Sequence, residues 1–409
     1  MPDRSVDFLL IGGGIAAANC ARWLREEGAE GSILLVGREP DAPYERPPLS
    51  KDYLRGEASR EDALFREEGW WGEQDIELLT RTSVMKLDAG ERVAKLSTKE
   101  EIGFGKALIA TGANVRRLRG DGTDLDGIHY LRAFGNSDAI RADAADAKRA
   151  VLIGGSYIGC EVAASLTEQG VECTILMQEE VPLERSFGPE VARFFEGVLV
   201  DHGVSLVAGD EFERFEGSGE RVEKVVTAGG RELAADMVVV GVGVMPDVML
   251  AKGAGLDLGE AGGVKCSSKL ETSVEGIYAA GDMCEWDSVI HGRDIRLEHW
   301  DVAFSHGKTA ALNMLGREVD HDVVPYFFSD LADWASMEYV GPGTGEAVVR
   351  GSMQNGEFTA FYVDGGKVRA ALTVGRSEDL DHARRFIADD VDARREHLED
   401  LDKELGDIS

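Results

Sequence analysis

Short apolar runs alternate with alanine-rich, helix-forming stretches along the first part of the chain. Apolar runs at residues 8–11 and 33–36 flank one such stretch, and runs at residues 151–153 and 174–176 flank another. A short apolar run next to glycine is typical of a strand buried in a parallel sheet. The order strand, helix, strand therefore predicts two βαβ units, one at the start of the chain and one near residue 150.

A glycine-rich turn joins strand to helix in each predicted unit. The turn at residues 11–17 reads IGGGIAA, and the turn at residues 153–159 reads IGGSYIG. An acid follows the next strand in both units, Glu39 in the first and Glu179 in the second. Such glycines let a pyrophosphate lie on the helix N-terminus, while the acid reaches a ribose hydroxyl. One such turn also closes ordinary β-α corners, but two in matching context predict a flavin and a nicotinamide dinucleotide.

Apolar runs further along the chain complete this arrangement. The runs at residues 107–112 and 237–243 both end in glycine, as the closing strands of two similarly folded domains would. The run at residues 276–282 ends in Gly-Asp and precedes a helical pattern at residues 302–315. We therefore expect the chain to return to the first domain after it has completed the second.

The C-terminal part of the chain has a different pattern. Strands predicted at residues 347–350, 358–363 and 368–374 are separated by glycine-containing turns, so we expect antiparallel hairpins. The charged tail from residue 378 to residue 408 predicts an amphipathic helix. We expect this helix to be solvated, in preference to a tail that binds a partner. Its apolar face would consist of Leu380, Ala383, Phe386 and Ile387.

Together these patterns predict an α/β fold with two Rossmann-type dinucleotide-binding domains and a C-terminal α+β interface domain. A chain of 409 residues is too long for one hydrophobic core and suits this division. We place the first dinucleotide-binding domain at residues 1–117 and 246–320 (discontinuous), the second at residues 118–245, and the C-terminal domain, with an acidic helical tail, at residues 321–409.

The charge of the chain restricts its partners. A formal net charge of -32 excludes the basic surface that nonspecific nucleic-acid binding needs. The carboxylates are spread along the whole chain, which we interpret as the surface of a halophilic protein that stays soluble in high salt. No apolar run approaches the roughly 20 residues needed to cross a bilayer, and the first strand begins too early for a signal peptide. We expect a cytoplasmic enzyme that does not associate with membranes.

The five cysteines argue against one class of enzyme with two dinucleotide sites. None forms a C-x-x-C pair, and no His/Cys cluster has zinc spacing. Disulfide reductases pass electrons through a paired or flavin-facing cysteine, and the sequence shows no such pair. Cys20 and Cys160 follow the two turns, where small buried residues are expected.

The segment Arg46-Pro47-Pro48-Leu49-Ser50-Lys51 is more specific than either turn. With both turns and the Gly-Asp strand, it makes the chain similar to the pyridine-nucleotide-dependent flavoprotein reductases. This family includes the ferredoxin, putidaredoxin and rubredoxin reductases and apoptosis-inducing factor. The resemblance covers about residues 6–345, and the second half most resembles apoptosis-inducing factor, at residues 245–252 and 297–301.

The resemblance assigns FAD to the domain at residues 1–117 and 246–320 and NAD to the domain at residues 118–245, and it implies a set of residues around FAD. Lys51 would lie beside the flavin ring, paired with Glu161, where a cation stabilises the reduced ring. An ordinary interdomain salt bridge is the alternative. Trp300 would complete the catalytic group by stacking near the rings, unless it only fills the core where domains meet. The other residues implied in FAD binding are Gly12, Gly13, Gly14, Ala16, Ala17, Arg38, Glu39, Arg46, Val84, Ala110, Thr111, Gly112, Arg116, Gly281, Asp282, His299 and Phe328.

The resemblance also implies a nicotinamide site. Glu179 would bind the ribose and repel a 2′-phosphate, which favours NADH over NADPH. The other residues implied are Gly154, Gly155, Tyr157, Ile158, Arg185 and Gly243.

Three positions depart from the family pattern. Arg38 stands where the acid that binds the FAD ribose is usual, so Glu39 must serve or the contact is lost. Ser156 replaces the middle glycine of the second turn. Met177 stands where reductase relatives carry their NADH-binding acid, so coenzyme preference depends on Glu179.

The activity implied is hydride transfer from NADH to flavin N5, after which electrons pass singly to a small iron-sulfur carrier such as ferredoxin or rubredoxin. A second hypothesis is an NADH-responsive flavoprotein like apoptosis-inducing factor, which acts mainly as a redox-sensing binding module. His299 and the spacing of Glu179 favour that branch, while Trp300 fits either. Both a monomer and a homodimer remain open.

Overall fold

The computed structural model describes residues 1–343 and 345–408, which fold as two compact units. The first unit contains residues 1–45, 61–114 and 245–325. The second contains residues 46–60, 115–244 and the chain from residue 326 onward. The second unit thus holds both the segment expected to bind NAD and the C-terminal part, and the three-domain boundaries given above stay a prediction.

The first unit is built on a sheet that forks along its longest strand, β6. Residues 107–109 of β6 pair in parallel with β18, and residues 101–103 pair with antiparallel β5. The parallel strands follow the order β3-β2-β1-β6, and β4 pairs with β5 at the other edge. These strands are β1 (Arg4–Ile11), β2 (Ile33–Val36), β3 (Ile76–Leu79), β4 (Val84–Asp88), β5 (Val93–Leu96), β6 (Glu101–Ile109) and β18 (Ile277–Ala279).

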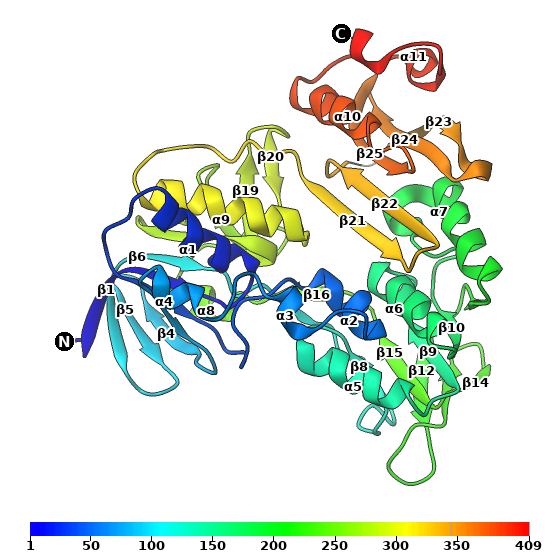
Figure 1. Cartoon of the computed structure of the whole chain (residues 1–409), viewed down its shortest axis with the longest axis horizontal. Helices are drawn as coiled ribbons and strands as arrows, with labels where there is room; N and C mark the ends of the chain where they lie inside the picture. Colours follow the sequence, from blue (N-terminus) through cyan, green and yellow to red (C-terminus); the bar gives the residue numbers. More distant parts are fainter. Residues whose placement is uncertain (344, 409) are drawn as a thin grey trace. The chain divides into compact units, whose positions relative to one another are not determined.

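Two long helices of the first unit, α1 (Ile15–Glu26) and α9 (Trp300–Met314), lie side by side (Figure 1). Their close approach depends on small residues. A Cβ atom added to Gly307 of α9 would lie 2.4 Å from the carbonyl oxygen of Ala16 on α1. The helix predicted at residues 302–315 is therefore present as α9. It packs on α1, the helix that follows the first turn, so the chain returns to the first unit as the run at residues 276–282 suggested.

The second unit begins with a parallel sheet of the same design. Its order is β11-β10-β9-β15-β8, so the closing strand β15 lies beside the first strand β9, as β6 lies beside β1. Three helices accompany this sheet, and a small antiparallel sheet follows β11. The elements are β8 (Ile128–Tyr130), α5 (Phe134–Ala144), β9 (Arg149–Ile153), α6 (Tyr157–Glu168), β10 (Glu172–Leu176), α7 (Glu184–Asp201), β11 (Ser205–Val207), β12 (Phe212–Glu216), β13 (Lys224–Thr227), β14 (Glu232–Ala234) and β15 (Met237–Val240).

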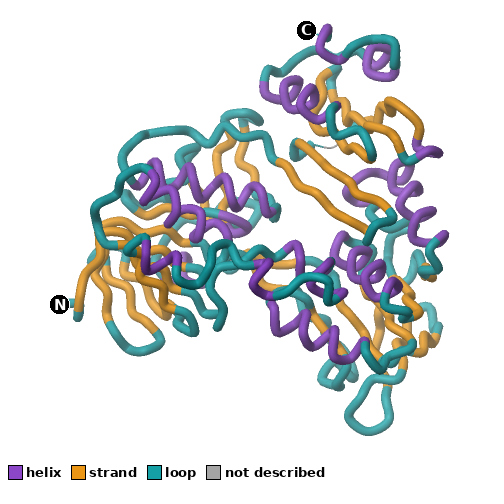
Figure 2. Tube along the Cα trace, in the orientation of Figure 1, coloured by secondary structure: helices purple, strands orange, loops and turns teal. Residues whose placement is uncertain are grey.

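The C-terminal part of the second unit is an antiparallel sheet in the order β21-β22-β25-β24-β23. The predicted hairpins are confirmed, because β23 pairs with β24 and β24 pairs with β25 across short turns. In Figure 2 these strands are followed by short helices. The elements are β21 (Tyr326–Leu331), β22 (Ala335–Val340), β23 (Glu346–Ser352), β24 (Glu357–Asp364), β25 (Lys367–Val374), α10 (Asp379–Ala388) and α11 (Arg395–Glu399).

The prediction of one solvated helix over the tail is wrong. Helix α10 ends at Ala388, and its apolar face is buried against β25. Side chains of β23 and of α10 itself hold the chain that follows α10. Arg350 donates to the carbonyl oxygen of Lys403 at 3.0 Å, and Arg385 donates to that of Ile408 at 2.8 Å. The four predicted apolar positions are all buried, at Leu380, Ala383, Phe386 and Ile387.

Short elements complete the structure. They are η1 (Pro47–Ser50), α2 (Asp52–Arg55), α3 (Arg60–Ala63), α4 (Trp70–Glu73), β7 (Ala113–Val115), β16 (Val244–Pro246), α8 (Met249–Gly253), β17 (Val264–Cys266), η2 (Gly281–Met283), β19 (Cys284–Ser288), β20 (Arg293–Ile295), η3 (Met353–Asn355) and η4 (Leu405–Asp407).

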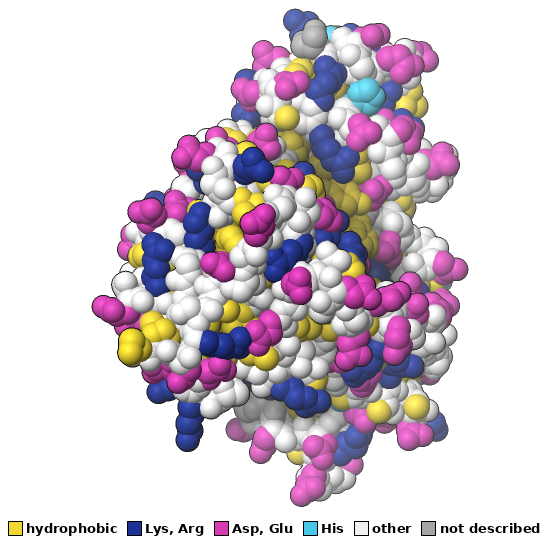
Figure 3. Space-filling model, turned by 60° about the vertical axis from the view of Figure 1, so that its left-hand side comes forward, with side chains coloured by type: hydrophobic (Ala, Val, Ile, Leu, Met, Phe, Trp, Pro, Cys, Tyr) yellow, Lys and Arg dark blue, Asp and Glu magenta, His cyan; other side chains and the backbone are white. Residues whose placement is uncertain are grey.

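The distribution of charged side chains and the environment of the cysteines agree with the sequence analysis. On the face shown in Figure 3, Asp and Glu side chains are scattered among Lys and Arg and do not gather in one patch. All five cysteines are buried and free, and burial raises the pKa of the Cys20 thiol. Within residues 1–343 and 345–408, no helix is long and apolar enough to cross a membrane.

We expect Gly307→Ala to lower the midpoint of thermal unfolding, because the added methyl group must push α9 away from α1. Overpacking of this kind costs about 1–3 kcal/mol. Gly197→Ala in α7 is the matched control, since no heavy atom lies within 4 Å of the added Cβ. It should be neutral or stabilise by up to about 1 kcal/mol. Equal midpoints for the two variants would contradict the packing argument.

Candidate active site

The two glycine turns have similar backbone conformations at Gly12 and Gly154, both with positive φ. Gly12 has a φ of 131°, and a Cβ atom added there would lie 2.1 Å from the carbonyl oxygen of Ala110. Gly154 has a φ of 110°, and its added Cβ would lie 2.5 Å from the carbonyl oxygen of Gly241. In both units the turn is thus pressed against the residue that follows the closing strand. A side chain fits at neither position.

Both turns leave a helix N-terminus open to an anion. Helix α1 begins after Gly14 and helix α6 after Ser156, and neither N-terminus is capped by a side chain. The hydroxyl of Ser156 donates to the carbonyl oxygen of Gly241 at 2.8 Å instead. Uncapped N–H groups and the helix dipole favour a phosphate at such a place. The residues of both turns therefore fit the pyrophosphates of FAD and NAD. Ser156 in the second turn bonds Gly241 and does not cap the N-terminus of α6.

The strand end after β2 is arranged around an acid that the sequence analysis missed. Arg38 donates to Asn114 Oδ1 at 2.9 Å and lies 3.3 Å from Asp247 Oδ2. Glu39 accepts a hydrogen bond of 2.5 Å from the Tyr44 hydroxyl. Asp247 follows strand β16, and no local pattern marked it as part of this group. The unusual Arg38 is therefore paired within the first unit.

The end of β6 is tied to the same acid through the backbone. The Thr111 hydroxyl donates to the carbonyl oxygen of Asp247 at 2.6 Å, and the Gly112 carbonyl accepts from the Asp247 amide at 2.8 Å. The amide of Ala110 donates to the carbonyl oxygen of Ile11 at 2.7 Å. The structure thus brings the expected Ala110–Gly112 segment next to the first turn. Val84, also expected near FAD, is half-buried at the start of β4.

The Gly-Asp pair after β18 rests on a buried histidine that the sequence analysis also missed. Gly281 has a φ of 77°, and its amide donates to His306 Nδ1 at 3.3 Å. Burial lowers the pKa of His306 well below its usual value, so the ring is neutral at pH 7 and can accept at Nδ1. The carbonyl oxygen of Asp282 accepts from Arg296 at 3.0 Å.

The residues at the start of α9, His299 and Trp300, are half-buried. Burial lowers the pKa of His299 to about 4, partly opposed by the nearby Asp282 carboxylate. His299 is therefore neutral at pH 7. The Trp300 ring stacks on Phe304 with centroids 5.1 Å apart and planes at 14°. One face of Trp300 is thus covered within its own unit, and its role near a cofactor ring stays a prediction.

At the second turn, Glu179 and Arg185 form an ion pair. The Glu179 side chain is mostly buried and the Arg185 side chain mostly exposed. Gly243 has a φ of 90°, and its carbonyl oxygen accepts from the backbone amide of Arg116 at 3.0 Å. Tyr157 at the start of α6 packs its ring on Phe327, and its neighbour Ile158 is exposed. Gly155 lies against the side chain of Met177.

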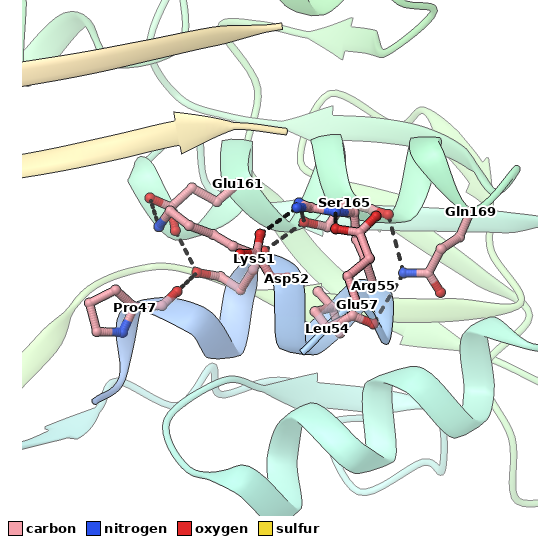
Figure 4. A network of polar contacts seen from close by, with 10 residues as sticks. Pro47, Lys51, Asp52, Leu54, Arg55, Glu57, Glu161, Ser165 and Gln169 are labelled. Atoms are coloured by element: carbon pink, nitrogen blue, oxygen red, sulfur yellow. Dashed lines mark hydrogen bonds and ion pairs between the residues drawn. The ribbon is translucent and has the colours of Figure 1, made fainter. Parts of the chain in front are cut away.

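A buried ion pair joins Lys51 to Glu161 of α6, with Nζ 2.7 Å from Oε1 (Figure 4). Their side chains are 10% and 5% exposed. The ring of Phe328 on β21 lies 5.7 Å from the Lys51 ammonium, a cation–π distance. The structure therefore brings these three expected residues together. Glu161 and Lys51 belong to the same compact unit.

One face of α6 holds the segment around Lys51. Ser165 Oγ donates to the carbonyl oxygen of Ser50 at 2.7 Å, and Gln169 Nε2, just past the helix, donates to that of Leu54 at 3.2 Å (Figure 4). Glu161, Ser165 and Gln169 are spaced four residues apart, so they lie on one helical face. This spacing is the signal in the sequence that could have located the face of α6 that contacts the segment around Lys51.

Arg46, expected against FAD phosphate, begins the same segment. Its guanidinium donates to the carbonyl oxygen of Arg132 within the second unit. Its role toward a phosphate stays a prediction, as do the roles of the other individual residues.

The comparisons with known proteins agree with this architecture. The profile described as pyridine nucleotide-disulphide oxidoreductase matches residues 6–307, and one described as reductase C-terminal matches residues 326–409. The ferredoxin reductase subunit of 5,5′-dehydrodivanillate O-demethylase from Sphingobium is 33% identical over 98% of both chains. Putidaredoxin reductase from Pseudomonas putida is 31% identical over 94% of this chain and 92% of its own length.

Solved structures agree as well. The ferredoxin reductase of the CYP199A2 system from Rhodopseudomonas palustris has a TM-score of 0.94 and 32% identity, with 98% of both chains covered. The covalent putidaredoxin reductase–putidaredoxin complex gives a TM-score of 0.93 and 31% identity over 98% of this chain and 97% of the other. The predicted fold class, two Rossmann-type domains and a C-terminal domain, is confirmed. The chain belongs to the pyridine nucleotide-disulphide oxidoreductase family, as a flavoprotein reductase that uses FAD and NAD(P)H.

Proposed function

We propose that the protein oxidises NADH and passes the electrons through FAD to a small iron-sulfur carrier, a ferredoxin or rubredoxin. The observation that carries the proposal is the buried Lys51–Glu161 pair beside Phe328, since a buried ammonium there would favour the reduced, negatively charged flavin. The names of the relatives support the acceptor: they are ferredoxin reductases of dioxygenase and demethylase systems, and one was solved joined to putidaredoxin.

The chain's own residues would orient and hold charge. The open N-termini of α1 and α6 would bind the two pyrophosphates. When bound, FAD supplies the chemistry, because a flavin accepts a hydride and releases electrons singly. The Lys51 ammonium would favour negative charge on the reduced ring, and Glu161 would keep the lysine in place. His299, whose pKa is lowered to about 4 by desolvation, stays neutral and adds no second cation at pH 7.

The same proposal includes a cytoplasmic location and a charged surface that keeps the protein soluble in high salt. It also includes a monomer or homodimer that binds neither membranes nor nucleic acid. The alternative of a binding module like apoptosis-inducing factor is favoured only by His299 and the spacing of Glu179 in the sequence. The relatives named above are all reductases.

The function is tested by steady-state turnover with NADH and a ferredoxin in molar potassium chloride. High salt screens the repulsion between an acidic enzyme and an acidic carrier. We expect turnover in the usual enzyme range of about 1–10³ per second. Turnover far below that range, with rapid flavin reduction by NADH, would favour the binding module.

Coenzyme choice depends on the Glu179–Arg185 pair. We expect Glu179→Ala to weaken NADH binding and relax discrimination against NADPH, because the released Arg185 can then pair with a 2′-phosphate. The ratio of kcat/KM for the two coenzymes is the measurement. Glu180→Ala, which removes an exposed neighbouring acid, is the control and should leave that ratio unchanged. An unchanged ratio in Glu179→Ala would mean that Glu179 is not the acid that binds the ribose.

The role of the lysine is tested by Lys51→Ala. We expect FAD to remain bound, while flavin reduction by NADH in a stopped-flow experiment slows by about tenfold or more, because the cation that favours the reduced ring is gone. Lys95→Ala on β5 removes an exposed lysine and is the matched control. If both variants are reduced at the wild-type rate, the ion pair is only structural.

A further inference from the structure

The carboxylate of Glu161 accepts more than the lysine. Oε1 accepts from Lys51 Nζ at 2.7 Å and from the Ser329 hydroxyl at 2.5 Å. Oε2 accepts from the Ser50 hydroxyl at 2.5 Å. All four residues are buried, with exposed fractions of 8% or less. The group is therefore a closed cluster of one cation, one carboxylate and two hydroxyls.

The two hydroxyls fix the plane of the carboxylate. The terminal torsion of a glutamate is broad, so one ion pair alone leaves the carboxylate free to turn. Here a hydroxyl holds each oxygen, and hydrogen bonds to a charged acceptor are the strong ones. Once both oxygens are held, the direction in which the carboxylate holds the flexible Lys51 side chain is also fixed.

The hydroxyls come from two rigid but separate elements. Ser50 ends η1, and its carbonyl oxygen is held by Ser165 of α6 at 2.7 Å. Ser329 lies in the middle of β21, paired in register with Met337 of β22. Its neighbour on the strand, Phe328, places a ring 5.7 Å from the Lys51 ammonium. Strand β21 thus touches both charges of the pair.

We infer that Ser329 is a positioning residue for Lys51 and acts through the Glu161 carboxylate. The C-terminal sheet then takes part in preparing the redox site, as well as packing against the nucleotide-binding part of its unit. The inference rests on the proposed function, because it assigns Lys51 a task at the flavin.

The test compares Ser329→Ala with Ser336→Ala in the FAD-loaded protein. Ser336 is exposed on β22 opposite Asp330, and its hydroxyl donates to the Asp330 carboxylate at 2.7 Å, so its loss leaves Glu161 untouched. The readouts are the rate of flavin reduction by NADH, the midpoint potential of bound FAD, the FAD content and the thermal midpoint.

For Ser329→Ala we expect reduction to slow by about tenfold, the scale of one lost hydrogen bond to a charged group. The flavin potential should move to a lower value, because a less fixed ammonium favours the reduced ring less. FAD content should stay near wild type, while the thermal midpoint should fall modestly, because a buried carboxylate loses one of its hydrogen bonds. Ser50→Ala should change the rate and potential in the same direction, because Ser50 holds the other oxygen. Ser336→Ala should match wild type in all four readouts.

Three results would overturn the inference: a wild-type rate and potential in Ser329→Ala, an equal loss in Ser336→Ala, or a loss that follows FAD content or thermal midpoint alone. Failure of the proposed function is distinguishable, because the wild-type protein itself would then show no flavin reduction by NADH.

Discussion

The second unit depends on the burial of one charge pair. Removing an ammonium and a carboxylate from water is costly, and their attraction repays it only with good geometry and further hydrogen bonds. Lys51 and Glu161 meet that condition because two serine hydroxyls complete the carboxylate. If either charge is lost, the other is left buried and uncompensated, which costs about 3–5 kcal/mol. Helix α6, the segment at residues 46–60 and strand β21 must therefore assemble together.

The two parallel sheets meet a different constraint, which is the distance between a turn and the neighbouring strand end. Gly12 and Gly154 satisfy it in the same way, each against a carbonyl group after the closing strand. The turns then differ in detail. Gly14 leaves open space at the first helix, whereas Ser156 at the second spends its hydroxyl on Gly241. The same backbone arrangement thus accepts either glycine or serine at the residue before the helix.

The sequence predicted the features that local pattern encodes. The strands, the two turns, α9 and the C-terminal hairpins all follow from runs of apolar residues and from glycine. The meeting of Lys51 with Glu161 was implied by the family resemblance alone. The single helix over the tail was wrong, because Arg350 and Arg385 hold the last residues through distant carbonyl contacts. Ser329 escaped notice because it lies 168 residues from Glu161. No local periodicity contains such contacts.

The docked segment at residues 46–60 has a consequence for the modularity of the chain. The polypeptide crosses between the two units five times, and this short segment is an excursion out of the first unit into the second. No single cut in the chain can release either unit whole. A chimera that exchanged only residues 115–244 would separate Glu161 from the lysine and the serines that neutralise it. Recombination among relatives would therefore have to move residues 46–60 and β21 together with residues 115–244, as one discontinuous cassette.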